Sequence, residues 1–361
     1  MKICFVKSSP CISHVRVSKF IEYFSKKKIP ISYVCWQREE KESHTEEKYI
    51  LKGGGYGSSK LALFYPLWIL LVFIHVLFKE KKDTKFFVID FESALPLYFA
   101  SLICHDLVYI YDIHDDFSLR YNFPRFVNRI IEILDDKIKK ASLKTIHVDE
   151  NRIRENDDNY TIIYNTPKDY YDKDNKDNKD NKDNKDKVVG NTFAVTGLLN
   201  KGRGLESIKL FAENNPELKF LVAGLTGDKL ASTFINLPNV EYLGVLNQEE
   251  LFKKISHCSF IFSLYDPSVE INRLAASNKL YDAMMLGIPV ITNSGLLAAD
   301  KVIKDDIGIV VNFEYDESWD IIINLSNTRI NEMGRNGRKQ YLDNFSFEVN
   351  VESKINEIIG W

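Results

Sequence analysis

Residues 277–292 read SNKLYDAMMLGIPVIT, and their pattern indicates the fold class. Ser277 is a favourable helix N-cap, the apolar residues that follow repeat with a helical period, and Gly287 suits the left-handed position that ends a helix. Pro289 then opens a short, continuous apolar run, which is typical of a strand buried on both faces. The stretch therefore predicts a helix followed directly by a strand of a parallel sheet.

The same alternation extends along the chain on both sides of this stretch. Strands without polar alternation indicate parallel sheets covered by helices, so the predicted fold class is α/β with Rossmann-like sheets. Ligands of such sheets bind at the carboxyl ends of the strands. The expected strands are 3–7, 31–36, 161–164, 193–196, 219–223, 240–242, 260–264, 289–292 and 308–311, and expected helices include 17–27, 205–214 and 248–256.

A triplet repeat divides the chain. Residues 172–187 read DKDNKDNKDNKDNKDK, contain no apolar side chain and cannot bury surface. The simplest interpretation is a solvated linker between two facing α/β domains with a ligand cleft between them, and the alternative is a long loop within one domain. The expected boundaries are 1–167 for an N-terminal domain, 168–188 for the linker, 189–345 for a C-terminal domain and 346–361 for a final helix that packs back toward the N-terminal domain.

Composition and charge indicate which partners to expect and in which cellular compartment the chain works. The 361 residues carry 48 Lys and Arg against 51 Asp and Glu, a net charge of −3, without a long basic tract. A nucleic-acid partner is therefore not expected. The five cysteines are scattered without CxxC spacing, which argues against a disulfide framework and against a zinc site. Because the N-terminus also lacks the apolar core of a signal peptide, we interpret the chain as cytoplasmic, with no metal or other cofactor.

The most apolar stretch is 61–78, LALFYPLWILLVFIHVLF, with Lys60 before it and charged residues after it. Its 18 residues are barely enough to span a bilayer, and Pro66 and His75 interrupt it. A span would also separate the first strands from the rest of their sheet. Two interpretations remain: a buried helix of the N-terminal domain, or a helix that rests its Trp, Phe and Leu side chains on the inner face of the membrane.

Residues 195–205, VTGLLNKGRGL, place a glycine-rich turn after an expected strand. Gly197 and Gly204 would let backbone amides approach a phosphate, and Lys201 and Arg203 supply charge-assisted donors. The alternative is ordinary turn chemistry with solvated basic side chains.

The helix that starts at Ser277 offers a second set of anion-binding groups. The backbone amides of Ser277, Asn278 and Leu280 lie at the positive end of the helix dipole. Lys279 adds a full charge there. Asp282 can accept hydrogen bonds from a ribose diol; alternatively, it complements the helix dipole.

His114 follows an apolar strand and lies between Asp112 and the pair Asp115 and Asp116. A neighbouring carboxylate can orient the imidazole ring or raise its pKa. His114 therefore either takes part directly in the chemistry or is held in the loop by these aspartates as a structural residue.

The two anion-binding segments together resemble glycosyltransferase family 4. The family's GRLxxxKG loop aligns with residues 197–204, so that Arg203 stands where the family has its phosphate-binding lysine and Leu198 where it often has an arginine. The family's ExxxxxxxE motif aligns its second acid with Asp282 and its first with Leu274.

Other segments match the family in the same order. Residues 278–291, NKLYDAMMLGIPVI, resemble a branch found among bacterial polysaccharide-assembly enzymes. Residues 14–20 resemble the family's DPRVxKxA, residues 108–117 its VYDxHE strand and loop, and residues 336–348 its terminal GRKxxxxxFSWE. The resemblance covers nearly the whole chain outside the repeat and implies the GT-B fold, in which two Rossmann-like domains face each other across a cleft.

The resemblance implies a retaining, metal-independent glycosyltransferase. It would move a sugar from a nucleoside-diphosphate donor, UDP-linked in the first instance, to a membrane-attached glycan intermediate of a capsule, O-antigen or exopolysaccharide. Catalysis is assigned to His114, Arg203 and Lys279, and the acceptor side to Arg16 and Asp115. Two alternatives stay open: a non-catalytic, degenerate transferase that acts as a membrane-peripheral partner, and a GT-B nucleotide-sugar epimerase.

Overall fold

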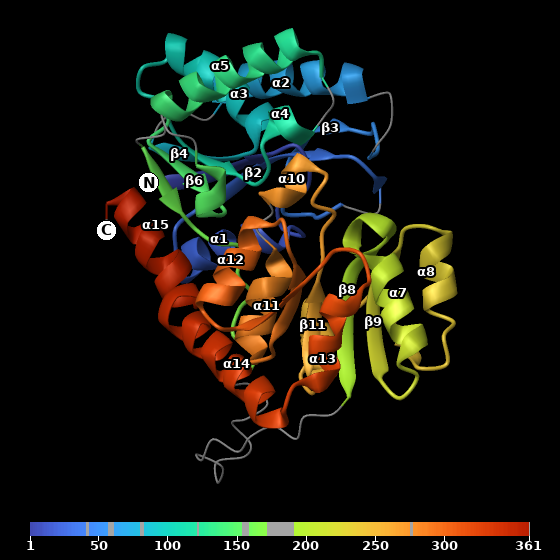
Figure 1. Cartoon of the computed structure of the whole chain (residues 1–361). Coiled ribbons are helices and arrows are strands. Elements are labelled where there is room, and N and C mark those ends of the chain that lie inside the picture. Colours follow the sequence, from blue (N-terminus) through green and yellow to red (C-terminus); the bar gives the residue numbers. More distant parts are fainter. Residues whose placement is uncertain are drawn as a thin grey trace. The chain divides into compact units, whose positions relative to one another are not determined.

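The computed structural model describes residues 1–40, 43–56, 61–79, 83–120, 123–153, 159–171, 191–274 and 277–360, so the repeat at 172–187 lies outside the described residues. The chain forms two compact units (Figure 1). Unit 1 comprises Met1–Tyr164 and Val351–Trp361, and unit 2 comprises Asn165–Asn350.

Unit 1 contains a parallel sheet of seven strands in the order β3-β2-β1-β4-β5-β6-β7, which is a doubly wound arrangement. Its strands are β1 (Lys2–Lys7), β2 (Ile31–Gln37), β3 (Tyr49–Lys52), β4 (Thr84–Ile89), β5 (Val108–Ile113), β6 (Lys144–His147) and β7 (Tyr160–Ile162). Its helices are α1 (Val15–Lys26), α2 (Leu61–Lys79), α3 (Phe91–Ile103), α4 (Phe117–Arg120), α5 (Arg125–Ala141) and α15 (Ser353–Ile359), with a 3₁₀ turn at Glu150–Arg152.

Helices cover both faces of this sheet. Successive residues of a strand point to opposite faces and therefore pack against different helices. Cys4 and Val6 of β1 lie in the core beneath α2, α3 and α5, which cover one face together (Figure 1). Phe5 points to the other face and packs on Phe24 of α1, with the ring centroids 6.0 Å apart. The apolar strands predicted from the sequence are therefore buried from both sides.

The apolar stretch 61–78 forms α2, and its two sides differ. Trp68 is fully buried and stacks on Trp36 of β2, with the ring centroids 6.1 Å apart. The expectation that this helix rests its Trp on a membrane surface is therefore wrong for Trp68, which belongs to the core. Leu63 and Leu70, on the opposite side, are exposed. Among the helices in the described part of the chain, none has the length and apolarity needed to cross a bilayer.

Unit 2 contains a second parallel sheet, of six strands in the order β10-β9-β8-β11-β12-β13. Its strands are β8 (Thr192–Leu199), β9 (Lys219–Thr226), β10 (Val240–Tyr242), β11 (Phe260–Ser263), β12 (Val290–Asn293) and β13 (Gly308–Val311). Its α-helices are α7 (Leu205–Asn214), α8 (Lys229–Phe234), α9 (Gln248–Ile255), α10 (Glu270–Arg273), α11 (Asn278–Leu286), α12 (Leu297–Lys304), α13 (Asp320–Asn324) and α14 (Asn327–Gln340). Shorter helical turns span Lys201–Arg203, Glu317–Trp319, Tyr341–Phe345 and Glu348–Glu352.

The helix and strand predicted at 277–292 are present as α11 and β12. Gly287 has φ +62° and ends α11, and β12 then pairs in parallel with β11 and β13. β8 is longer than predicted, since it continues through Gly197 to Leu199 instead of ending at Thr196. Gly197 pairs with Gly224 of β9, and a Cβ on Gly224 would lie 1.8 Å from the Gly197 carbonyl oxygen. The glycine at position 224 thus allows the two strands to stay paired where any side chain would collide with the Gly197 backbone.

Candidate functional site

The carboxyl end of β8 leads into a tight turn that carries Arg203. The 3₁₀ turn Lys201–Arg203 ends at Gly204, which has φ +68° and starts α7. A Cβ on Gly204 would lie 2.7 Å from the Leu264 side chain, so both the backbone and the packing require glycine. This close packing fixes the position of the turn, and therefore the position of the Arg203 backbone.

Arg203 and Lys279 converge on one buried aromatic ring. The Arg203 guanidinium carbon lies 3.9 Å from the centroid of the Tyr265 ring, and Lys279 Nζ lies 5.8 Å from the same centroid. Lys279 Nζ is also 3.2 Å from the point that a Cβ on Gly197 would occupy, so the missing side chain there makes room for the ammonium group. Both cations line one small pocket, together with Thr196 and other residues of β8.

Arg203 and Lys279 bring two positive charges to this pocket. Arg203 Nη1 is buried and has no hydrogen-bond partner in the part of the chain that the structure describes. Burial alone would raise the pKa of the Tyr265 hydroxyl, and so would Asp282, but the charges of Lys279 and Arg203 together with the hydrogen bond to Ser277 outweigh them and lower this pKa below its usual value. The Tyr265 hydroxyl therefore lies in a net positive electrostatic potential. A guanidinium group with a buried, unused donor is suited to bind an anion.

The start of α11 lies beside this pocket. Ser277 is its N-cap residue and is buried, and its hydroxyl is 2.6 Å from that of Ser263 and 3.4 Å from that of Tyr265. Leu280 is buried in the core, and Asp282 is half-buried in the second turn of the helix.

Two other predicted donor-binding residues, Lys201 and Asn278, have partners of their own. Lys201 pairs with Glu206, with 3.1 Å between Nζ and Oε2, and its side chain is 74% exposed. The structure therefore does not bring Lys201 to Tyr265. The side-chain oxygen of Asn278 accepts a hydrogen bond of 2.9 Å from Asn165, so this amide is already engaged within unit 2.

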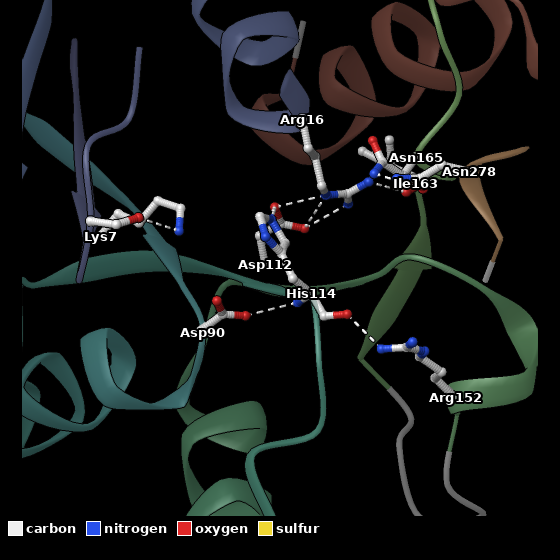
Figure 2. A network of polar contacts seen from close by, with 10 residues as sticks. Lys7, Arg16, Asp90, Asp112, His114, Arg152, Ile163, Asn165 and Asn278 are labelled. Atoms are coloured by element: carbon white, nitrogen blue, oxygen red, sulfur yellow. Dashed lines mark hydrogen bonds and ion pairs between the residues drawn. The ribbon is translucent and has the colours of Figure 1, made fainter. Parts of the chain in front are cut away.

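In unit 1, Arg16 and Asp112 form a buried ion pair (Figure 2). Arg16 Nε and Nη2 donate to the carboxylate at 3.0 and 2.6 Å, and Nη1 donates to the Ile163 carbonyl at 2.6 Å. Burial would raise the pKa of Asp112, but Arg16 and His114 more than compensate and hold it well below its usual range. Arg16, which the sequence assigns to the acceptor side, is 2% exposed, and all three of its guanidinium nitrogens have partners within the unit.

His114 is held on three sides (Figure 2). Its Nε2 lies 2.8 Å from Asp112 Oδ2, its backbone N–H donates to Asp90 at 3.0 Å, and its carbonyl accepts from Arg152 at 2.5 Å. A carboxylate can only accept, so Nε2 carries a proton, and in the neutral ring Nδ1 is then the acceptor nitrogen. The ring also stacks on His14, with the centroids 4.8 Å apart. The His114 side chain is 13% exposed, so the ring is held in one orientation and is still accessible to solvent.

Asp115, the second predicted acceptor-side residue, pairs with Arg152. The distance from Arg152 Nη1 to Asp115 Oδ1 is 2.9 Å, and 42% of the Asp115 side chain remains exposed. The same arginine therefore anchors both the His114 carbonyl and the Asp115 carboxylate, which stiffens the loop after β5.

Sequence reasoning missed a second polar cluster in unit 1. Ligand atoms of Cys11, Cys35 and Glu47 lie within 4.8 Å of one another, and the two sulfur atoms are 3.3 Å apart. Glu47 Oε1 already accepts from the Cys11 and Ile12 amides, and Oε2 accepts from Tyr49. Burial raises the pKa of the Cys35 thiol, which opposes the thiolate that a metal requires. Cys11, Cys35 and Glu47 therefore do not fit a metal centre. They are far apart in the sequence, so no spacing motif indicated that they would meet.

Comparison with known proteins shows the fold. No family model matches the chain, and no curated protein matches it by sequence. Sucrose-phosphate synthase from Thermosynechococcus elongatus is 12% identical, with a TM-score of 0.69 over 100% of this chain and 98% of that one. HepE from Anabaena, solved in complex with UDP, is 14% identical, with a TM-score of 0.69 over 100% of both chains. A UDP-N-acetylglucosamine 2-epimerase is 10% identical, with a TM-score of 0.59 over 100% of this chain and 97% of that one.

The class of fold follows from these matches and from the two sheets. The chain has the GT-B fold, with two Rossmann-like α/β units, as the sequence resemblance implied. The identities lie far below those at which a shared fold shows a shared activity.

Proposed function

We propose that the chain is a glycosyltransferase that takes its sugar from a nucleoside-diphosphate donor, with UDP as the nucleotide. One observation carries the proposal: Arg203 and Lys279 meet over Tyr265, and Arg203 Nη1 is buried without a partner among the described residues. The pocket lies at the carboxyl end of β8, where a Rossmann-like sheet binds its ligands. HepE, which matches over its full length, was solved with UDP bound.

The chemistry proposed for unit 2 is stabilisation of a departing diphosphate. When the anomeric C–O bond breaks, negative charge moves onto the leaving-group oxygen. Arg203 and Lys279 would stabilise this charge, because fixed cations in a partly dehydrated site need little rearrangement when charge develops. The backbone amides at the start of α11 would add a dipole of the same sign. Asp282 would hold the ribose diol.

The finer features of the proposal come from the family resemblance. We propose retention of the anomeric configuration, no requirement for a metal, and a membrane-attached glycan intermediate of a capsule, O-antigen or exopolysaccharide as the acceptor. On the acceptor side, His114 would present Nδ1 to the reacting sugars while Asp112 fixes its other nitrogen. Arg16 would position His114 through Asp112 without contacting substrate.

Turnover of UDP-sugars by the Arg203→Ala variant tests this proposal. Removal of the guanidinium takes away a contact that strengthens as the leaving group gains charge, so UDP release should fall by about 100-fold, on the scale of losing one preorganised donor. Arg203→Lys is the matched control and should retain most of the rate, because the family carries lysine at this position. Wild-type turnover in a folded Arg203→Ala protein would contradict the proposal.

A second candidate is a nucleotide-sugar epimerase, because a UDP-N-acetylglucosamine 2-epimerase shares the fold. The products separate the two candidates in one assay. A transferase releases UDP and, with an acceptor present, forms a new glycoside. An epimerase inverts a sugar stereocentre, which nuclear magnetic resonance of the recovered sugar would detect.

A further inference from the structure

Three neighbouring helices of unit 1 share an exposed apolar surface. α3 packs against both α2 and α5, and the three cover the same face of the sheet (Figure 1). Their outward sides carry large apolar side chains that are 79% exposed at Phe78, 77% at Leu63 and 69% at Phe126. We define the three-helix face by Leu63, Leu70 and Phe78 of α2, Ile103 of α3, and Phe126 and Ile130 of α5.

On α2 and α5 the exposed apolar residues lie on a different side of the helix from the residues that pack in the core. On α5, Phe126 and Ile130 are four residues apart and share one side, whereas Ile131 and Ile138 are buried in the core on the other. α2 likewise buries Trp68, Val72 and Val76 and exposes the opposite side. Exposed large apolar side chains that gather on the outer sides of packed helices indicate an interaction site.

The charges around the face are mainly positive. α5 carries five basic residues and three acidic ones; Lys139 is buried and pairs with Asp135, and Arg129 pairs with Glu132. Arg125 and Arg129 are exposed beside Phe126 and Ile130, and Lys137 and Lys140 are exposed farther along the helix. The only acidic residue of α3 is Glu92, which is 2% exposed, and α2 has none. An anionic partner therefore complements the face.

The positive charge of the three-helix face favours an anionic bilayer over a second copy of the chain as the partner. In a symmetric dimer the same patch would meet itself, which would bring the basic residues of two copies together. An anionic bilayer offers negative phosphates to the Arg and Lys side chains and an acyl boundary to the apolar ones, which is how interfacial helices bind membranes.

We propose that the three-helix face docks unit 1 on an anionic bilayer, with α2, α3 and α5 in the plane of the lipid headgroups. The inference deepens the proposed function and rests on it for its role, since a face of this kind would bring the enzyme to a membrane-attached acceptor. It adds α3 and α5 to the apolar stretch that the sequence singled out, and it makes Phe126 and Ile130 the side chains that insert.

Sedimentation of the full chain with vesicles tests the docking. The wild type should bind vesicles rich in phosphatidylglycerol, bind phosphatidylcholine vesicles weakly, and be partly released by salt. Phe126→Glu/Ile130→Glu should lower the partition coefficient by about 100-fold, because each large apolar side chain contributes roughly tenfold. Arg125→Gln/Arg129→Gln should lower it by about 25-fold, or fivefold for each charge.

The matched control is Ile303→Glu on α12 of unit 2, where the isoleucine is 65% exposed. This variant should bind vesicles like the wild type, and a thermal melt should show all variants folded. Failure of the wild type to bind either vesicle overturns the proposal, as does wild-type binding by Phe126→Glu/Ile130→Glu. A wild-type dimer that this double substitution dissociates would also overturn it, because the face would then be a protein interface.

UDP binding measured on the same samples keeps the two proposals apart. Vesicle binding without UDP binding would count against the glycosyltransferase and support the docking surface. UDP binding without vesicle binding would do the reverse.

Discussion

Asp112 is a fully buried carboxylate whose charge is balanced by Arg16 and oriented toward His114. Breaking such a pair leaves a buried charge without compensation, whereas replacing both partners with apolar residues is far less costly. Asp112→Leu should therefore lower the free energy of unfolding by about 3–5 kcal/mol, and Arg16→Met/Asp112→Leu should recover much of that loss. Urea unfolding measures both. A double variant as unstable as the single one would show that the pair does not act as a unit.

His14 should make folding sensitive to mild acid. Burial first, and then the charges of Lys7, His114 and Arg16, hold the pKa of His14 far below its usual value, and Asp112 opposes them. Below about pH 6.5 the unfolded chain binds a proton at His14 that the folded chain refuses, so stability falls by about 1.4 kcal/mol per pH unit as pH falls. The wild type should thus lose about 2 kcal/mol more than His14→Asn between pH 7 and pH 5.

Chemical unfolding at several pH values measures this difference. The matched control is His105→Asn, at an exposed turn, whose stability should follow that of the wild type. Parallel pH profiles for the wild type and His14→Asn would contradict the account of His14.

Single residues also show where sequence reasoning reached its limit. The motif that contains Arg16 was recognised, yet its burial could not be, because the partner Asp112 and the Ile163 carbonyl come from distant segments. Tyr265 was missed entirely, since one aromatic residue after a strand has no signal of its own. The sequence does single out Arg203 and Lys279, which the structure places beside the same ring, because charged residues at strand ends and helix starts meet at one edge of a parallel sheet.

Among the elements, the turn between β8 and α7 can be tested with two neighbouring glycines. Gly204 has φ +68° and no room for a Cβ beside Leu264, whereas a Cβ on Gly202 would meet only Asn200 at 3.6 Å. Gly204→Ala should lower the free energy of unfolding by about 1–3 kcal/mol, because strain and overpacking add, and should weaken UDP binding by shifting Arg203. Thermal unfolding and UDP titration measure the two effects.

Gly202→Ala is the control for this turn and should change stability by less than about 0.5 kcal/mol. Equal effects of the two substitutions would mean that the positive φ at Gly204 does not determine the turn.

Two of the strands that are missing from the sequence-based prediction have only four residues each. The edge strand β3 (Tyr49–Lys52) has only four residues and alternates in burial, so it lacks the continuous apolar run of a central strand. β6 (Lys144–His147) is equally short and begins with a lysine. The central strands β1 and β11 were predicted nearly to their ends, because both faces of each are buried.

At the scale of the whole chain, the alternation of apolar strands and helices predicted the α/β class and both sheets. The GT-B fold was implied by a resemblance of ordered motifs and is supported by full-length matches to solved structures. The activity does not follow from the fold, and it depends on whether the pocket of Arg203 and Lys279 binds a nucleotide diphosphate.

Calorimetric titration of UDP into the wild type and into Arg203→Ala tests that claim most directly. The account predicts that the wild type binds UDP and, at about 100 times the dissociation constant, gains roughly 2.7 kcal/mol of stability against unfolding. Arg203→Ala should remain folded and lose most of this affinity, while Arg203→Lys keeps most of it. A folded wild type that neither binds UDP nor is stabilised by it, or an Arg203→Ala variant with undiminished affinity, would contradict the account.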